Sequence, residues 1–146
     1  VEVDNTTFYN FRHTTTGNDG GYPLLPSNEE KNFVLRDSLG YLIDQMGRIT
    51  YSSLSYNEYV VDDSTANSDF TYNLKLAQES VTLVTNAGTF SCLDNQYFFR
   101  FNNGSTSTGV DHIYRENGVG EVLTTSSFAS QNSHFAEKRL ESYSVQ

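Results

Sequence analysis

The segments that decide the fold are Leu42-Ile43-Asp44-Gln45-Met46-Gly47-Arg48-Ile49-Thr50-Tyr51 and Leu83-Val84-Thr85-Asn86-Ala87-Gly88-Thr89-Phe90-Ser91-Cys92. Each runs from a short apolar strand through a Gly turn into a second strand, and an aromatic strand follows, at 56–61 and 97–101. The two copies align at one offset of 41 residues, and a weaker third copy covers 113–123. Because a repeated strand unit cannot bury its own apolar face, the repeat predicts similar units around a shared core.

The rest of the sequence also favours β-structure. The chain has ten Tyr, ten Phe and one Met, and no Trp, and aromatic and β-branched residues suit a pleated, half-buried surface. From Phe33 onward, short strands and turn residues alternate about every eight to twelve positions, which is typical of a sandwich or barrel. We therefore expect an all-β fold, a β-trefoil-like barrel of repeated β-units, with a β-sandwich as the alternative.

The chain divides into three expected regions. Residues 1–32 form an irregular polar lead-in, 33–125 the all-β domain, and 126–146 a polar C-terminal tail, either separate or packed on the domain. Within the tail, 135–143 is expected to form one marginal helix. The polar run 102–109 has no apolar side chain to anchor it and is expected to be a flexible surface loop.

Local signals within the domain are sharper. The clearest strand is Phe70 to Leu76, because apolar and polar side chains alternate along it. The stretches 37–40 and 44–47 are expected to be turns, since Asp caps its own turn and Gly accepts positive φ.

Charge limits the classes of partner. Nine Lys plus Arg against eighteen Asp plus Glu give a net charge of -9, which argues against nucleic acid and anionic membranes. No apolar run is long enough to span a bilayer. The chain opens at Val1 without a signal-peptide pattern, so we expect a trimmed, mature segment. The oligomeric state is left open.

Residues of the types used in catalysis and metal binding are present, but their spacing does not indicate a site. Paired carboxylates would suit glycoside hydrolysis, but no spacing singles out a pair among Asp62, Asp63, Asp69, Glu79, Asp94 and Asp111. The histidines His13, His112 and His134 lack ligand spacing, and 62–69 resembles a calcium loop in composition only. No nucleophile motif occurs. We expect no catalytic residues, no metal and no cofactor.

Three features bear on processing and packing. Cys92 is the only cysteine, so no internal disulfide can form, and we expect a small buried apolar residue. Asn5 and Asn103 begin Asn-x-Ser/Thr sequons in segments expected to be exposed, which makes both candidate N-glycosylation sites. Lys138-Arg139 is a dibasic pair that a secretory protease could cleave.

Tyrosines among Asn and Asp suggest a sugar-binding surface. Tyr51, Tyr56 and Tyr59 could stack on sugar rings while Asp62 and Asp63 bind hydroxyl groups, because Tyr combines an apolar face with a polar tip. Core packing accounts for at least half of these tyrosines, so this patch is the alternative to a structural role.

Two runs resemble a known family. Phe33 to Ile49, FVLRDSLGYLIDQMGRI, and Phe90 to Phe99, FSCLDNQYFF, are similar to the C-terminal domain of the Pir family of yeast cell-wall mannoproteins. The resemblance implies a glycosylated, secreted wall component with a compact all-β domain. The family has several cysteines where this chain has only Cys92, and its glucan-linked Asp-Gly-Gln-Ile-Gln repeat is absent, so no linkage residue carries over.

The sequence thus leads to a functional expectation with alternatives. The first is a secreted fungal cell-wall structural or adhesive glycoprotein domain without catalytic activity. The second is a carbohydrate-binding lectin module whose partner is a wall polysaccharide, glucan or mannan. A glycoside hydrolase fragment and a secreted toxin subunit remain further alternatives.

Overall fold

The regular elements of the described residues are all β-strands, which confirms the all-β expectation. The structure is a computed structural model that describes residues 2–3, 6–15, 29–62 and 69–144. Its strands are β1 (Glu2–Val3), β2 (Thr6–Thr7), β3 (Tyr9–Thr15), β4 (Glu29–Ser38), β5 (Tyr41–Asp44), β6 (Ile49–Ser52), β7 (Glu58–Asp62), β8 (Phe70–Leu76), β9 (Val81–Thr85), β10 (Gly88–Phe101), β11 (Asp111–Glu116), β12 (Gly120–Ser127) and β13 (His134–Arg139).

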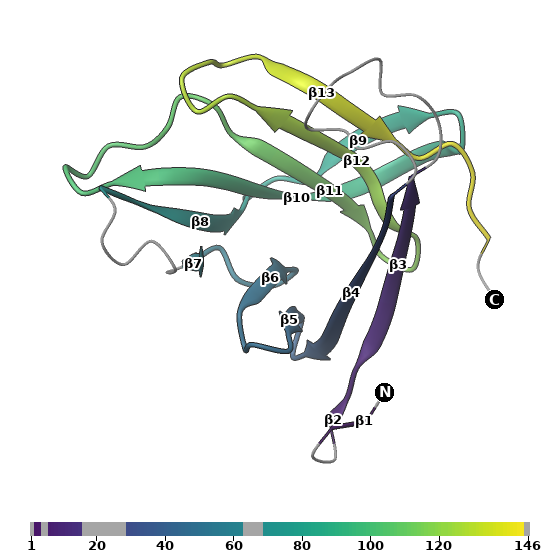
Figure 1. Cartoon of the computed structure of the whole chain (residues 1–146). Helices are drawn as coiled ribbons and strands as arrows, with labels where there is room; N and C mark the ends of the chain where they lie inside the picture. The colour runs from purple at the N-terminus through teal and green to yellow at the C-terminus, as the bar shows by residue number, and fades with distance from the viewer. Residues whose placement is uncertain (1, 4–5, 16–28, 63–68, 145–146) are drawn as a thin grey trace.

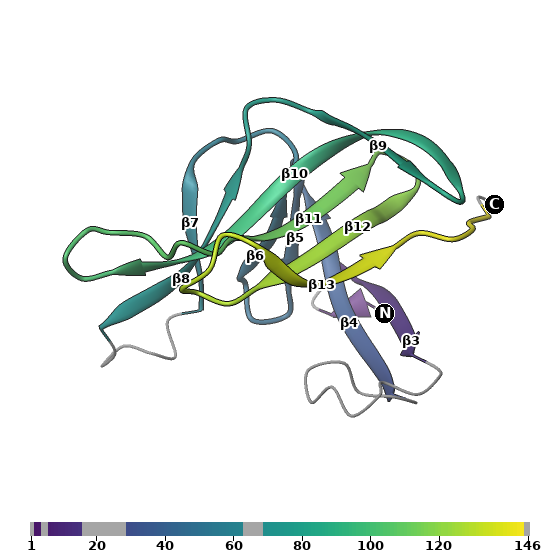
Figure 2. The ribbon, with the colours of Figure 1, turned by 90° about the horizontal axis from the view of Figure 1, so that it is seen from above.

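The strands form two main antiparallel sheets (Figure 1). A four-stranded sheet has the order β3-β4-β5-β6, and a seven-stranded sheet has the order β13-β12-β11-β10-β8-β7, with β9 paired to β10. Figure 2 shows β10 running through the middle of the larger sheet, with β11, β12 and β13 beside it. The short strands β1 and β2 pair only with each other.

Two predicted turns are confirmed. Leu39 and Gly40, with φ of 53° and 85°, connect β4 to β5, and two positive φ values are the mark of a type I′ hairpin turn. The Oδ1 atom of Asp44 accepts hydrogen bonds of 2.9 Å from the backbone N–H groups of Met46 and Arg48. Asp44 therefore caps its own turn, as its position before Gly47 indicated.

The repeated segments are hairpins, but they do not build a barrel. The first copy forms β5 and β6 in the smaller sheet, whereas the second forms β9 and the start of β10 in the larger one. Their turns also differ, because Gly47 lies within its loop while Gly88 is the first residue of β10 and pairs with Thr85. No closed barrel forms among the described strands, so they do not show the threefold arrangement of a trefoil.

The larger sheet holds most of the buried core. β8 spans the predicted strand, and its Leu74 and Leu76 are buried. On the other side of β10, Phe90, Cys92 and Val122 form a buried cluster. The burial of Cys92 confirms that it is a core residue.

β10 is longer than the sequence indicated. The polar residues 94–96, expected to separate two strands, continue a single strand of 14 residues. The strand pairs first with β9 over 88–92 and then with β8 over 95–101. Residues 93 and 94, between these two pairings, pair with β11, so the strand continues through the polar run.

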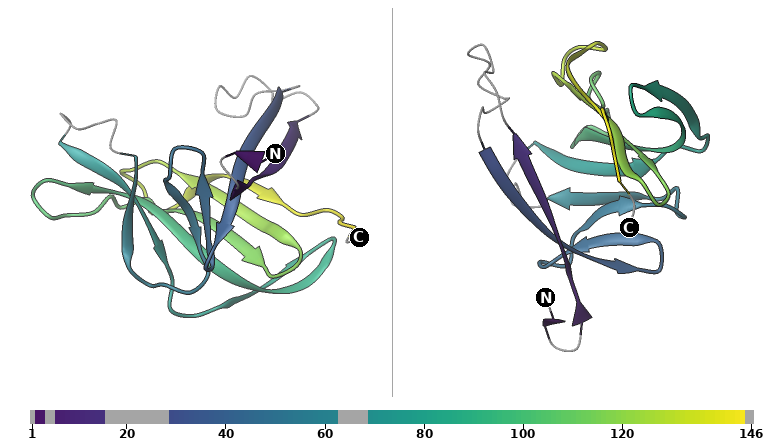
Figure 3. Two further views of the ribbon diagram at one scale, coloured as in Figure 1. Left: turned by 90° about the horizontal axis from the view of Figure 1, so that it is seen from below. Right: turned by 90° about the vertical axis from the view of Figure 1, so that its right-hand side faces the viewer.

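The two sheets meet through polar contacts from β10 to β6. The backbone N–H of Ser52 donates a hydrogen bond of 2.9 Å to Oδ1 of Asn95, and the Tyr97 hydroxyl donates to the carbonyl of Thr50. Beside them, the Arg115 guanidinium lies 4.8 Å from the ring centroid of Tyr51. Figure 3 shows the β3–β4 hairpin extending past β5 and β6.

Two local expectations differ from the structure. The lead-in expected to be irregular contains β1, β2, β3 and the start of β4. The helix expected over 135–143 is absent, because 134–139 form β13, which pairs with β12. Packing against a neighbouring strand overrode a weak helical pattern. Leu140 packs against the buried cluster, while the division into three regions stays a prediction.

The second half of the predicted loop 102–109 is held in place. Ser107 is buried, and its hydroxyl donates a hydrogen bond of 2.7 Å to the carbonyl of Gly109. Gly109 lies so close to the carbonyl of Phe128 that a Cβ atom there would overlap it. Polar and backbone contacts therefore replace the apolar anchor that the sequence lacks.

Candidate functional site: an aromatic row on the larger sheet

Five aromatic side chains on β8 and β10 form a continuous series of ring contacts. Tyr97 stacks on Tyr72 at 5.9 Å between ring centroids, and Tyr72 contacts Phe99 at 5.1 Å. Phe70 meets Phe99 at 5.1 Å and Phe101 at 6.3 Å, edge to face in both cases. We call these residues the aromatic row.

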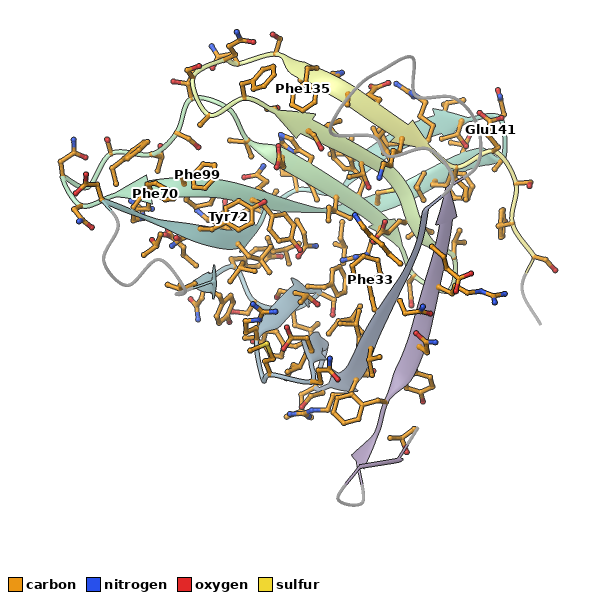
Figure 4. The ribbon with its side chains drawn as sticks, in the orientation of Figure 1. Phe33, Phe70, Tyr72, Phe99, Phe135 and Glu141 are labelled. Carbon is orange, nitrogen blue, oxygen red and sulfur yellow. The ribbon has the colours of Figure 1, made fainter. Side chains whose placement is uncertain are left out.

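The strand register places the row on one face. Phe99 is paired with Tyr72, and Phe101 with Phe70, and cross-strand partners point to the same side of a sheet. Figure 4 shows Phe70, Tyr72 and Phe99 gathered at one end of the larger sheet, away from Phe33 on β4.

The row changes from buried to accessible along its length. Tyr97 is buried, and its hydroxyl is bound to the smaller sheet. The remaining four rings are half-buried. The accessible part on β10 runs from Phe99 to Phe101, two steps that cover about 7 Å at a rise of about 3.4 Å per residue.

Polar groups border the row at two places. The Tyr72 hydroxyl donates to Oδ2 of Asp111 at 3.4 Å, and Oδ1 of Asp111 accepts a 2.6 Å hydrogen bond from the N–H of Ser127. Burial raises the pKa of the Asp111 carboxyl above its usual value, and burial also raises the pKa of Tyr72. The Tyr72 hydroxyl thereby keeps its proton and can donate the hydrogen bond to Asp111.

At the outer end of the row lies a shallow hollow of about 290 Å³. Its lining combines one aromatic side chain with a carboxylate and two amides, namely Phe101, Asp69, Asn102 and Asn103. This mixture of one apolar face and several hydrogen-bonding groups is the chemistry that a sugar requires.

The tyrosines proposed from the sequence are not among the five rings of this row, although Tyr59 on β7 pairs with Leu74 on β8. The ring of Tyr51 is covered on one face by Arg115. Tyr59 is bound through its hydroxyl to Ser55 at 2.8 Å and to the Tyr41 hydroxyl at 3.1 Å. Tyr56 is 52% exposed. The structure thus brings Tyr59 to Tyr41 and directs Tyr51 toward the sheet interface.

Several proposed residues lie where the structure gives no description. Asp63 and Asn5 are outside the described residues, as is most of the run 62–69 that resembled a calcium loop. Asp62 ends β7 and His13 lies in β3. The proposed roles of these residues stay predictions.

A buried carboxylate orients one histidine on the opposite face of the larger sheet. Nδ1 of His112 lies 2.9 Å and 3.0 Å from the two oxygens of Asp94, and the imidazole stacks on Tyr114 at 5.5 Å. Gln96 also donates to Asp94, at 2.9 Å. An Asp that fixes an imidazole is one element of general acid–base sites. The neighbouring thiol is a poor nucleophile, because burial raises the pKa of Cys92 to about 11.

The carboxylates considered for glycoside hydrolysis do not converge where the structure describes them. Asp94 lies on the face of Gln96, whereas Asp111 is paired with Tyr97 and lies on the other face, because successive side chains alternate. Asp69 and Glu79 are exposed. No group of three or more His, Cys, Asp or Glu side chains in the described residues is arranged to hold a metal ion.

The sequence contains the pattern that builds the aromatic row, although the repeat is its more prominent feature. Phe70 alternates with Tyr72, and Tyr97 with Phe99 and Phe101, so each strand carries aromatic residues on one face. The alternation along each strand can be seen in the sequence, but the pairing of β8 with β10 cannot. The register of β8 against β10 places the aromatic residues of both strands on one surface.

Comparison with known proteins gives no relative: the chain matches no family model, no curated protein and no solved structure. In the described part of the chain there is no helix that could cross a membrane.

Proposed function

We propose that this chain is an adhesive β-domain of a secreted, fungal cell-wall glycoprotein, and that the aromatic row binds a neutral wall polysaccharide. The observation that carries the proposal is the row itself: four half-buried rings on one face, continuous by contact and bordered by carboxylates. Pyranose rings present C–H faces that pack on aromatic rings while their hydroxyl groups bind polar neighbours.

The charge of the chain favours a neutral ligand. A net charge of -9 opposes polyanions, and Asp69 and Asp111 lie beside the row. Carboxylates accept hydrogen bonds from sugar hydroxyls without needing a charged ligand. Glucan or mannan therefore fits the row better than a sulfated or phosphorylated polysaccharide does.

The extended shape of the aromatic row also supports a role in adhesion. The accessible rings extend along β8 and β10 and border the shallow hollow at Phe101. Such a surface can contact the side of a long chain at any point along its length. This arrangement suits attachment to a polymer, and the similarity of 33–49 and 90–99 to Pir wall proteins points the same way.

The test is a titration with soluble β-1,3-gluco-oligosaccharides and manno-oligosaccharides, with heparin as the anionic comparison. Protein made in bacteria is used, so that no attached sugar competes for the row and Asn103 stays unchanged. We expect saturable binding to one neutral oligosaccharide and none to heparin. Absence of saturable binding to both neutral ligands would contradict the proposed binding and leave a purely structural role.

Variants locate the site. Phe99→Leu keeps an apolar side chain and removes the ring, and we expect it to weaken binding about two- to tenfold, since a ring contact is worth about 0.5–1.5 kcal/mol. Phe33→Leu is the matched control, because Phe33 is 43% exposed but lies on the smaller sheet. Equal losses in the two variants would place the binding elsewhere.

A further inference from the structure

We propose that Asn103 carries an N-linked glycan whose first sugar packs on Phe101 and stabilises the hairpin between β10 and β11. The proposal rests on secretion of the chain, as above, but not on the proposed polysaccharide ligand. Its support is the geometry of residues 101–105 at the tip of that hairpin.

The tip is a tight turn with a defined shape. Gly104 N–H donates to the carbonyl of Phe101, and Phe101 N–H donates to the carbonyl of Ser105, both at 2.9 Å. Gly104 has a φ of 86°, the left-handed conformation that closes a three-residue hairpin loop. A Cβ atom on Gly104 would meet nothing within 4 Å, so the tip is open to solvent.

The two reacting parts of the sequon are in contact within this turn. Oδ1 of the exposed Asn103 accepts hydrogen bonds from the N–H of Ser105 at 2.9 Å and from its hydroxyl at 2.7 Å. The hydroxyl at the third sequon position thus already faces the side-chain amide that is modified. Because all the residues involved are local, the chain can form this arrangement before the sheets assemble.

The chemistry is a glycosyl transfer from a lipid-pyrophosphate-linked oligosaccharide, which the secretory pathway supplies. The amide nitrogen Nδ2 of Asn103 forms a bond to C1 of the first sugar as the bond from C1 to the pyrophosphate oxygen breaks. The lipid pyrophosphate leaves with the electron pair of that bond, and the amide nitrogen gives up one proton. No oxidant or reductant is needed.

Phe101 is placed to receive the sugar. It precedes Asn103 by two residues and lines the same hollow of about 290 Å³, together with Asp69 and Asn102. A sugar on Nδ2 is therefore attached at the rim of a cavity with an aromatic side chain in its wall. The apolar face of the sugar can cover the half-buried ring while its hydroxyl groups meet the polar lining.

The second sequon provides a comparison within the chain. Two residues before Asn5 stands Val3, whereas Phe101 stands two residues before Asn103. A glycan on Asn5 lacks an aromatic partner at that spacing. All test proteins therefore carry Asn5→Gln, which leaves Asn103 as the one sequon.

The experiment compares protein secreted from yeast behind a signal peptide with the same sequence made in bacteria. Mass spectrometry measures occupancy of Asn103, and thermal unfolding is recorded before and after trimming to a single N-acetylglucosamine. We expect Asn103 to be occupied and the glycan to raise Tm by about 3 °C, with the gain retained after trimming. An unoccupied Asn103, or loss of the gain on trimming, would overturn the proposal.

Phe101→Leu separates packing on the ring from a general effect of the glycan. It keeps an apolar side chain in the hollow, and we expect the glycan-dependent rise in Tm to fall below about 1 °C. An equal rise in the Phe101→Leu protein and the parent would also overturn the proposal. Occupancy and Tm are measured without any added polysaccharide, so failure here is distinct from failure of the proposed ligand binding.

Discussion

Asn95 in the middle of β10 joins the two sheets by accepting a 2.9 Å hydrogen bond from the backbone N–H of Ser52 at the end of β6. Both residues are 0% exposed. A buried N–H without a partner is costly, so this side chain has a structural role that no apolar residue can fill.

Replacing Asn95 should therefore destabilise the fold. Asn95→Ala leaves the N–H of Ser52 buried and unpaired, and we expect the free energy of unfolding to fall by about 1–3 kcal/mol. Denaturant unfolding measures the change. Asn132→Ala, at an exposed position, should change the free energy by less than about 0.5 kcal/mol. A similar small change for Asn95→Ala would contradict the proposed role of this contact.

The thiol of Cys92 should be unreactive until the protein unfolds. Burial first, and the nearby Glu116 carboxylate second, raise its pKa from 9.0 to about 11, so the thiolate fraction at pH 8 is about 100-fold lower than in the unfolded chain. Labelling with a thiol reagent at pH 8 should be slow in the native protein and fast in denaturant.

A matched control moves the thiol by one residue. Ser91 is exposed on the other side of the same strand, so the double variant Ser91→Cys, Cys92→Ser should label rapidly in the native state. Fast labelling of native Cys92 would show that the core around Phe90 opens readily.

The pair of Glu58 and Arg100 should stabilise the fold at neutral pH and not in acid. Two hydrogen bonds of 2.5 Å from Arg100 lower the pKa of Glu58 below 4.5, against the opposing effect of burial. A carboxyl with a lowered folded-state pKa adds stability above its unfolded pKa, and this stability is lost as the pH falls through the folded value.

Glu58→Gln tests this pH dependence. We expect the variant to be less stable than the parent by about 1 kcal/mol at pH 7, since the pair is partly exposed, and the difference to shrink as the pH falls below 4.5. Unfolding free energies across pH 2–7 measure it. Glu79→Gln, at an exposed position, should show no such trend. A constant difference at every pH would rule out the ion pair as its cause.

The sequence predicted those features that depend on neighbouring residues. The turn at Leu39 and Gly40, the self-capped turn at Asp44 and the alternation along β8 all follow from residues within a few positions. The hairpins of the repeat were predicted for the same reason. The arrangement of these hairpins in two different sheets was not predicted, because it depends on packing between distant segments.

The other features of the fold could not be predicted from neighbouring residues. The aromatic row requires the register of β8 against β10, and the contact between Asn95 and Ser52 joins residues 43 positions apart. The strand β13 forms because β12 offers it an edge, although its own sequence suggested a helix. The roles of these side chains therefore depend on strand pairings and contacts between segments that are distant in the sequence.

The order of the strands has a consequence for how the chain folds. In both sheets each strand pairs with one that is adjacent in sequence or separated from it by a single strand, so loop closure costs little entropy. The contacts from Asn95 and Tyr97 to β6 span 43 and 47 residues, more than the pairings within either sheet, so we expect the sheets to join after the rate-limiting step of folding. Substitutions at this junction should then accelerate unfolding and leave the refolding rate nearly unchanged.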